Sequence, residues 1–293
     1  MAQKKKVLED LEALNSLKNL AQSYEEIAVV RMQKIKDSVL KTRDFLADLS
    51  DVFVDLKASY EREVQEILKK RKAGDKTLLP GLQKNGKTLA VYLSSNGRLY
   101  GSVTQKTFKL FVQDLHQMEC DIVVIGSAGK EMFENSSAKR DFEYFELPDT
   151  DISVDHIKKL MQKFIPYEKV YIYYGKFGNV VKQTAISTSI TGEEIFEAEV
   201  KEPAAREDRF IFEPTLEKIF HFFEAHIMAN LFSQTLLENQ LARHASRVSA
   251  MEEALVNIEQ ESKKLKQEQN RIKHQMQNKK QLELMSGVIS LME

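Results

Sequence analysis

The chain has 293 residues, of which 42% are hydrophobic and 30% charged, a composition typical of a folded protein with a sizeable core. A formal net charge of -1 gives no general attraction to nucleic acid or to anionic lipid, so we expect no nucleic-acid partner. The single cysteine, Cys120, excludes an internal disulfide and a cysteine-built zinc site. No apolar run approaches the ~18 residues of a membrane span, so we expect no direct membrane insertion.

Helix-breaking residues are absent from both ends of the chain. Of 11 glycines and 5 prolines, none precedes Gly74 and none lies between Pro214 and Gly287. Because Gly and Pro are the most unfavourable residues in a helix interior, two stretches of about 70 residues without them predict two long helices. The chain therefore divides into an N-terminal helix (1–73), a central domain (74–209) and a C-terminal helix (210–293).

Both terminal segments carry the 3.5-residue repeat of a coiled coil. In the first segment the repeat comprises Met32, Ile35, Val39, Thr42, Leu46, Leu49, Phe53, Leu56 and Tyr60. In the last segment it comprises Leu241, His244, Val248, Met251, Leu255, Ile258, Ser262, Leu265, Gln269, Ile272 and Met276. One helix enters the central domain and the other leaves it, so we expect them to pair antiparallel.

The central domain is predicted to alternate strands and helices. Strands are expected at 88–94, 121–125, 142–147, 169–174 and 180–190, and helices at 104–118, from 130 onward and at 153–164. This order predicts a small, mostly parallel sheet, with the last two strands joined as an antiparallel hairpin through 175–179. The fold class is therefore α/β: a Rossmann-like domain inserted into a long antiparallel coiled coil.

The sequence offers only weak candidates for a nucleotide-binding, catalytic or metal site. Residues 81–88 match the phosphate-binding P-loop pattern, but they lead into a strand instead of a helix, so we favour a linker. The turn Gly126–Gly129 follows a strand and begins a helix. Tight turns of this kind use glycine for its backbone conformation, so we favour a structural turn over a ligand site. His221 and His226 lie about 140° apart around a helix, which disfavours a shared metal. We expect no catalytic residue, no metal and no cofactor.

A basic run lies near the C-terminal end: Lys263, Lys264, Lys266, Arg271, Lys273, Lys279 and Lys280, interrupted by Glu268. Such a run is usually a solvated helix face. Its position at the end of a long helix also suits contact with an acidic partner.

Several motifs together resemble the gamma subunit of F-type ATP synthases, the central rotor shaft. The segment 210–214, with Phe212, Glu213 and Pro214, is similar to the family's Y-x-x-E-P. The stretch from Glu238 and Asn239 through Arg247, Met251 and Asn257 is similar to its E-N-x7-R-x2-A-M-x2-A-x2-N. Ser286-Gly287 near the end, the turn that ends at Gly101, the I-G-x-x-G element at Gly126 and the Lys176-Phe177 pair also fit.

The sequence also departs from the family pattern. The lysine-rich first helix of the family is reduced to 18–20 and 31–32, and its S-E pair before the arginine motif is Ala242-Arg243. Near the tip, the family's R-Q-x-x-I-T-x-E falls on Lys273-His274, Gln277-Asn278 and Lys280, so the acid has become a base.

The resemblance implies a non-catalytic shaft that transmits rotation between a catalytic ATPase ring and an ion-translocating membrane part. It implies alpha and beta ring subunits, an epsilon-type stalk subunit and a membrane c-type ring as partners, with a peripheral location at the cytoplasmic face of the membrane. Ring contacts are expected at Arg247, Met251, Lys273, His274, Asn278 and Lys280. The alternatives are a paralogous rotary ATPase, a coiled-coil scaffold and, least favoured, a P-loop nucleotide-binding enzyme.

Overall fold

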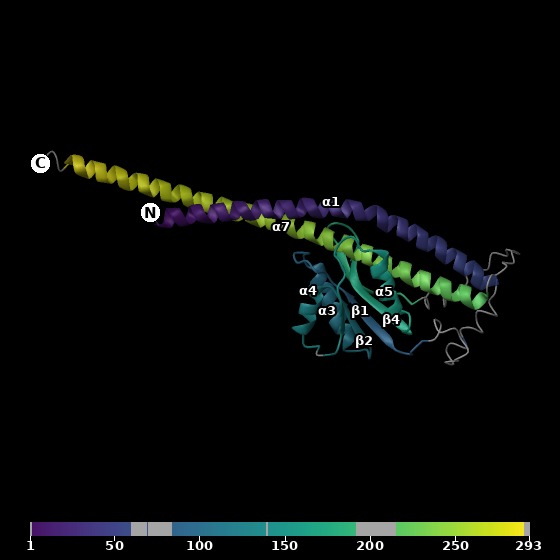
Figure 1. The fold of residues 1–293 in the computed structure, drawn as a ribbon. Helices are drawn as coiled ribbons and strands as arrows, with labels where there is room; N and C mark the ends of the chain where they lie inside the picture. The colour runs from purple at the N-terminus through teal and green to yellow at the C-terminus, as the bar shows by residue number, and fades with distance from the viewer. Residues whose placement is uncertain (1, 60–68, 70–83, 139, 192–214, 290–293) are drawn as a thin grey trace. The chain divides into compact units, whose positions relative to one another are not determined.

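The computed structural model describes residues 2–59, 69, 84–138, 140–191 and 215–289 (Figure 1). The predicted domain boundaries at 73/74 and 209/210 lie outside these ranges and stay predictions. No helix among the described residues combines the length and the apolar character that crossing a bilayer requires.

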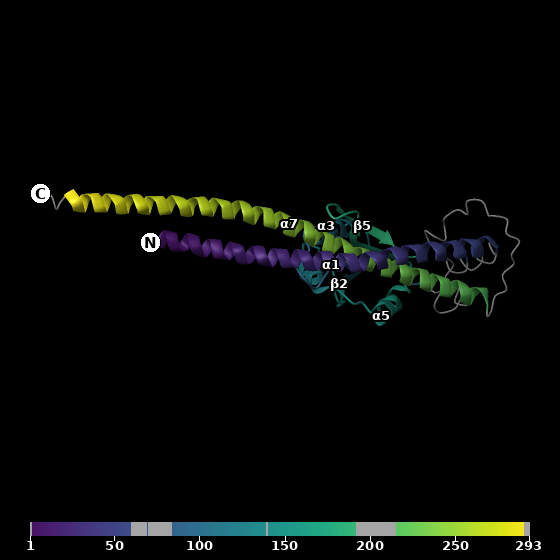
Figure 2. The same ribbon diagram turned by 90° about the horizontal axis from the view of Figure 1, so that it is seen from above.

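The structure contains two long helices, as the absence of helix breakers predicts. Helix α1 runs over Ala2–Ser59 and helix α7 over Leu216–Ile289, the latter with 74 residues. The chain forms two compact units: Met1–Val29 with Arg247–Glu293, and Val30–Ser246. Within each unit the segments of α1 and α7 lie side by side and run antiparallel (Figures 1 and 2).

The heptad seam of the first unit is visible in the burial of its side chains. On α7 the predicted positions Met251, Leu255, Ile258, Ser262, Leu265, Gln269 and Ile272 are all half-buried, whereas most residues between them are exposed. Met276 is 43% exposed, so the buried seam ends one step earlier than the repeat suggests. On α1 the seam extends further toward the N-terminus than predicted, through Val7, Leu14, Ala21 and Ala28 at seven-residue intervals. Alanine conceals this part of the repeat, because it scarcely raises the hydrophobicity of a window.

The part of α1 in the second unit follows its predicted repeat. Val39 is buried, and Met32, Ile35, Thr42, Leu46 and Leu49 are half-buried. Phe53, Leu56 and Tyr60 lie outside the residues whose side chains are described.

A five-stranded sheet forms the centre of the second unit. Its strands are β1 (Thr88–Leu93), β2 (Asp121–Ile125), β3 (Glu143–Phe145), β4 (Lys169–Phe177) and β5 (Gln183–Ser189). The order is β3-β2-β1-β4-β5, parallel except for the antiparallel pair β4 and β5. The predicted mostly parallel sheet is confirmed.

Three shorter helices follow strands, as predicted. They are α3 (Val103–Leu115), α4 (Ser127–Glu134) and α5 (Val154–Phe164). Helix α4 begins three residues before the expected Lys130, because acceptors from the β1 turn stand at its N-terminus: Ala128 donates to the Ser95 carbonyl and Ser127 to the Asn96 side chain.

The sheet is covered on both faces. On one face Val91, Leu93 and Ile125 pack with residues of α5 and with Met228, Phe232 and Leu236 of α7. On the other face Tyr92 and Tyr173 pack with residues of α3 and α4 around Phe111, whose ring lies 5.1 Å from that of Tyr173. Helix α7 is therefore one of the layers of the α/β core (Figure 1).

The hairpin is displaced from its predicted position. The residues 175–177 continue β4, and the turn covers 178–182 instead of 175–179. Asn179 explains the shift: its side-chain oxygen accepts hydrogen bonds from the backbone N–H groups of Val181 and Lys182 and so builds the turn three residues later.

Candidate functional site

A buried polar face on α7 meets the carboxyl end of the sheet. Asn239, Gln240 and Arg243 are spaced so that they share one side of the helix, and all three are buried. Asn239 bridges two strands: its amide nitrogen donates to the Leu93 carbonyl at 3.2 Å, and its oxygen accepts from the Gly175 N–H at 3.1 Å. One amide thus satisfies backbone groups at the ends of both β1 and β4.

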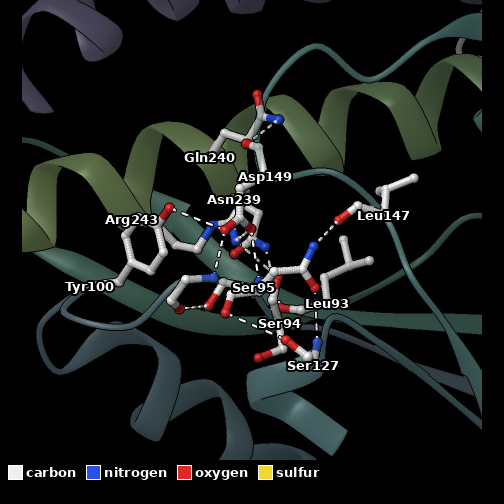
Figure 3. A network of polar contacts seen from close by, with 12 residues as sticks. Leu93, Ser94, Ser95, Tyr100, Ser127, Leu147, Asp149, Asn239, Gln240 and Arg243 are labelled. Atoms are coloured by element: carbon white, nitrogen blue, oxygen red, sulfur yellow. Dashed lines mark hydrogen bonds and ion pairs between the residues drawn. The ribbon is translucent and has the colours of Figure 1, made fainter. Parts of the chain in front are cut away.

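An ion pair anchors the same face of α7. The Arg243 Nη1 lies 2.8 Å from Asp149 Oδ1 and also donates to the Ser94 carbonyl at 3.0 Å (Figure 3). The side chains of Arg243 and Asp149 are only 6% and 18% exposed, so the pair is largely shielded from water. Gln240 adds a contact to the same loop, because its amide donates to the Asp149 carbonyl at 3.0 Å.

Asp149 also holds the turn that follows β1. Its carboxylate accepts hydrogen bonds from the backbone N–H groups of Asn96, at 3.0 Å, and Gly97, at 2.7 Å. Burial by itself raises the pKa of Asp149, but the Arg243 charge and these donors outweigh it and leave the pKa below its ordinary value. Asp149 is therefore an anion at neutral pH, and its carboxylate ties together the β1 turn, its own loop and α7.

The turn after β1 lies in close contact with the backbone of α7 at Gly101. This residue has a φ of +63°, and a Cβ placed on it would lie 2.5 Å from the Ser246 carbonyl oxygen. The neighbouring Leu99 also adopts a left-handed φ of 66° and is 54% exposed. Glycine is required at 101 for two separate reasons: its backbone conformation and its distance from the helix.

Tyr100 covers the ion pair from the same turn. Its ring lies 5.0 Å from the Arg243 guanidinium, within the range of a cation–π contact, and 5.9 Å from the His244 ring. His244 is 1% exposed and packs against this ring.

The turn at Gly126 has a structural role. Gly126 has a φ of +98°, and a Cβ there would lie 2.8 Å from the Ser95 backbone. Because acceptors from Ser95 and Asn96 already occupy the first N–H groups of α4, this helix end offers no open anion site.

The P-loop-like segment is likewise built into the sheet in its described part, 84–88. Lys87 pairs with Asp121 at 3.3 Å, and Lys84 donates to the Ile165 carbonyl at 2.7 Å. The lysines of this segment are used within the domain, and a strand follows them, as the linker interpretation predicts. Across the described ranges no three His, Cys, Asp or Glu side chains gather to hold a metal ion.

The residues expected to contact a ring divide into two groups. Arg247 is buried, and its guanidinium lies 5.5 Å from the Tyr24 ring; Met251, about one helical turn further along α7, is half-buried. Lys273, His274, Asn278 and Lys280 are exposed, as is every described side chain from 273 to 285. The second group is available for a partner, whereas Arg247 is already used inside the first unit.

The residues of the family motifs fall in several environments. Glu238 is 2% exposed and accepts a hydrogen bond from Gln234 at 3.0 Å. Asn239 bonds to β1 and β4, Gly101 lies against the backbone of α7, and Asn257 is exposed. Phe212, Glu213 and Pro214 lie outside the described residues.

Asp149, Gln240 and Tyr100 were not predicted from the sequence. A signal was present for Gln240, since 239, 240 and 243 place three polar side chains on one side of a helix. Asp149 carries no such signal, because its partners lie 52, 53 and 94 residues away.

Replacing Asp149 by Asn should lower the free energy of unfolding of the second unit by about 3 kcal/mol at pH 7, because Arg243 loses its buried partner. The folded-state pKa is depressed, so the Asp149 contribution is complete above the unfolded-state pKa of about 3.9 and is lost as the pH falls through the folded value. The difference between wild type and variant should therefore be constant from neutral pH down to about pH 4 and shrink below it. Urea unfolding followed by circular dichroism measures it.

The matched control is Glu131→Gln, which removes the exposed pair that Glu131 forms with Arg98 at 2.7 Å. Exposed pairs contribute ~0–1 kcal/mol, so this variant should be nearly neutral. Equal losses in the two variants would contradict the anchoring role of Asp149.

Replacing Gly101 by Ala should destabilise the fold by about 3 kcal/mol or more, because left-handed strain and a clash with the α7 backbone add together. Gly86 is the control: it has a φ of +70°, but nothing lies within 4 Å of a Cβ placed there. Gly86→Ala should therefore cost only the strain, about 1–2 kcal/mol. The same urea titrations compare the two, and similar costs would show that contact with α7 is unimportant.

Comparison with known proteins places the chain in a family. A family model described as ATP synthase matches residues 3–291. The ATP synthase gamma chain of Cytophaga hutchinsonii is 22% identical, covering 98% of this chain and 98% of that protein, and the gamma chain of Mycoplasmopsis pulmonis is 25% identical, covering 83% and 84%.

Solved structures share the fold. A chain of the Euglena gracilis mitochondrial ATP synthase (OSCP/F1/c-ring) has a TM-score of 0.64 at 14% identity, covering 99% of this chain and 95% of that one. A chain of the Tetrahymena thermophila mitochondrial ATP synthase central stalk and c-ring has a TM-score of 0.53 at 17% identity, covering 80% and 99%. Since the family model spans almost the whole sequence and its relatives match over nearly their full length, the chain belongs to the ATP synthase gamma-chain family.

Proposed function

We propose that this chain is the non-catalytic rotor of the central stalk of an F-type ATP synthase or a closely related rotary ATPase. The observation that carries the proposal is the continuity of α7. Its residues Met228, Phe232 and Leu236 belong to the core of the α/β domain, and its residues from Met251 to Ile272 form the coiled-coil seam with α1. A helix that takes part in both the domain and the coiled coil is suited to carry torque from one to the other.

The polar contacts between α7 and the α/β domain support this role. A helix held against a sheet by apolar packing alone could slide or roll, because dispersion contacts have little directionality. The hydrogen bonds of Asn239, Gln240 and Arg243 fix both the rotation and the axial position of α7 on the sheet. Removing these hydrogen bonds should weaken the transmission of rotation before it weakens assembly of the proposed complex.

The proposed partners follow from family membership and from the exposed tip. Alpha and beta ATPase subunits would surround the coiled coil, while an epsilon-type subunit and a membrane c-type ring would bind the α/β domain. The protein would then sit peripherally at the cytoplasmic face of a membrane as part of that complex. Lys280 stands where the family motif has an acid, and this change favours a second candidate, a paralogous rotary complex with a different output.

Affinity purification tests the proposal directly. A peptide tag inserted in the 178–182 turn avoids both helix ends and lies between paired strands. We expect the tagged chain to recover several ATPase subunits for each copy of itself, as quantified by mass spectrometry. Recovery without any ATPase subunit would contradict the rotor function.

The exposed tip provides a residue-level prediction. Reversing the charge at Lys273 and Lys280 should lower coupled ATPase activity of the assembled complex about tenfold, or about 1.4 kcal/mol, if these cations meet acidic groups on the ring. The helix content should not change, because both side chains are exposed. The double reversal of Lys158 and Lys159 on α5 alters the net charge equally and should leave activity unchanged. Equal effects of the two reversals would refute the contact.

A further inference from the structure

A groove lies between α1 and α7 in the unit formed by Met1–Val29 and Arg247–Glu293. Its volume is about 450 Å³. The half-buried side chains of Leu14 and Ile258 form its apolar part, and its polar lining is Asn15, Lys18, Glu259, Ser262, Lys263 and Lys266. The volume falls within the ~300–1,000 Å³ typical of small-molecule sites.

The groove is encoded by the coiled-coil repeat. Lys18 occupies the seam position between Leu14 and Ala21, and Ser262 occupies the seam position between Ile258 and Leu265. Polar residues at seam positions reduce coiled-coil stability and are kept where they serve another purpose. Here both helices place one at the same point, which opens the seam.

Among the described residues, cations outnumber acids in the lining of the groove. Lys18, Lys263 and Lys266 line it against a single acid, Glu259. Within the described ranges none of these three lysines forms an ion pair, whereas the adjacent Lys264 pairs with Glu261 at 2.6 Å. Three ammonium groups around one concavity repel one another and concentrate anions there.

We propose that this groove binds a phosphoryl oxyanion, either free phosphate or pyrophosphate or the phosphate chain of a nucleotide. The donor set fits: three ammonium groups supply charge, and the Asn15 amide and the Ser262 hydroxyl supply neutral hydrogen bonds. A compact multivalent anion can reach lysines from both helices at once, because the donors converge on one concavity from its two sides. That convergence favours a small ligand over an acidic protein segment.

Binding would join the two helices. An anion held by Lys18 on α1 and by Lys263 and Lys266 on α7 stabilises the paired state, because it binds only where both helices are present. The proposal goes beyond the rotor function and does not depend on it, since the groove is complete within this chain.

The test is a titration of the full-length chain at constant ionic strength. Pyrophosphate, inorganic phosphate, ATP and adenosine are added separately, and binding is followed by calorimetry and, for the phosphates, by ³¹P line width. We expect saturable binding of pyrophosphate and ATP, weaker binding of phosphate and none of adenosine. Lys18→Gln and Lys266→Gln should each weaken pyrophosphate binding about tenfold, as expected for the loss of one charge-assisted contact.

Lys264→Gln is the matched control, because it removes the same charge one residue from the groove lining. It should leave the pyrophosphate affinity within about twofold of wild type, well inside the tenfold effect of one strong contact. Circular dichroism must show unchanged helix content in all three variants.

Three results would overturn the proposal. One is the absence of saturable pyrophosphate binding, and another is an equal loss of affinity in Lys264→Gln, which would mean diffuse attraction to a basic helix. The third is tighter binding of a short polyglutamate peptide than of pyrophosphate through the same lysines, which would assign the groove to an acidic protein segment. None of these outcomes bears on whether the chain recovers ATPase subunits.

Discussion

The Asp149–Arg243 ion pair is the contact on which the junction between sheet and helix depends. It is mostly buried, so each charge relies on the other, and the same carboxylate also orients the turn after β1. Because that turn carries Gly101 against the α7 backbone, three segments far apart in sequence are fixed by one side chain. Apolar burial drives α7 onto the sheet, and this polar cluster determines where along the helix it rests.

Most of the fold could be predicted from the sequence because it depends on local signals. The absence of glycine and proline indicated the helices, and the heptads of α7 indicated which side chains are buried up to Ile272. The predictions were wrong where hydrogen bonds that the local pattern does not reveal set the end of an element. The hairpin turn lies later than predicted because Asn179 bonds to the backbone after it, and α4 starts earlier because Ser95 and Asn96 accept hydrogen bonds from its first residues. Asp149 was missed altogether, since nothing in its own neighbourhood indicates a partner on another element.

Arg243 shows what a buried charge requires of the surrounding structure. It is a cation whose side chain is nearly fully buried. A buried cation without a counter-charge is very unfavourable, so Asp149 on a separate loop is the required complement.

The small residues in the seam of α1 have a consequence for the thickness of the coiled coil. Ala21 and Ala28 are buried where leucine or isoleucine usually fills the space, and the distance between packed helices depends on the side chains at their contact. Alanine lets two backbones approach more closely, at the expense of some apolar area and therefore of some adhesion. In the proposed rotor, a thinner coiled coil would need a narrower opening in the surrounding subunits, at the cost of weaker adhesion between its two helices.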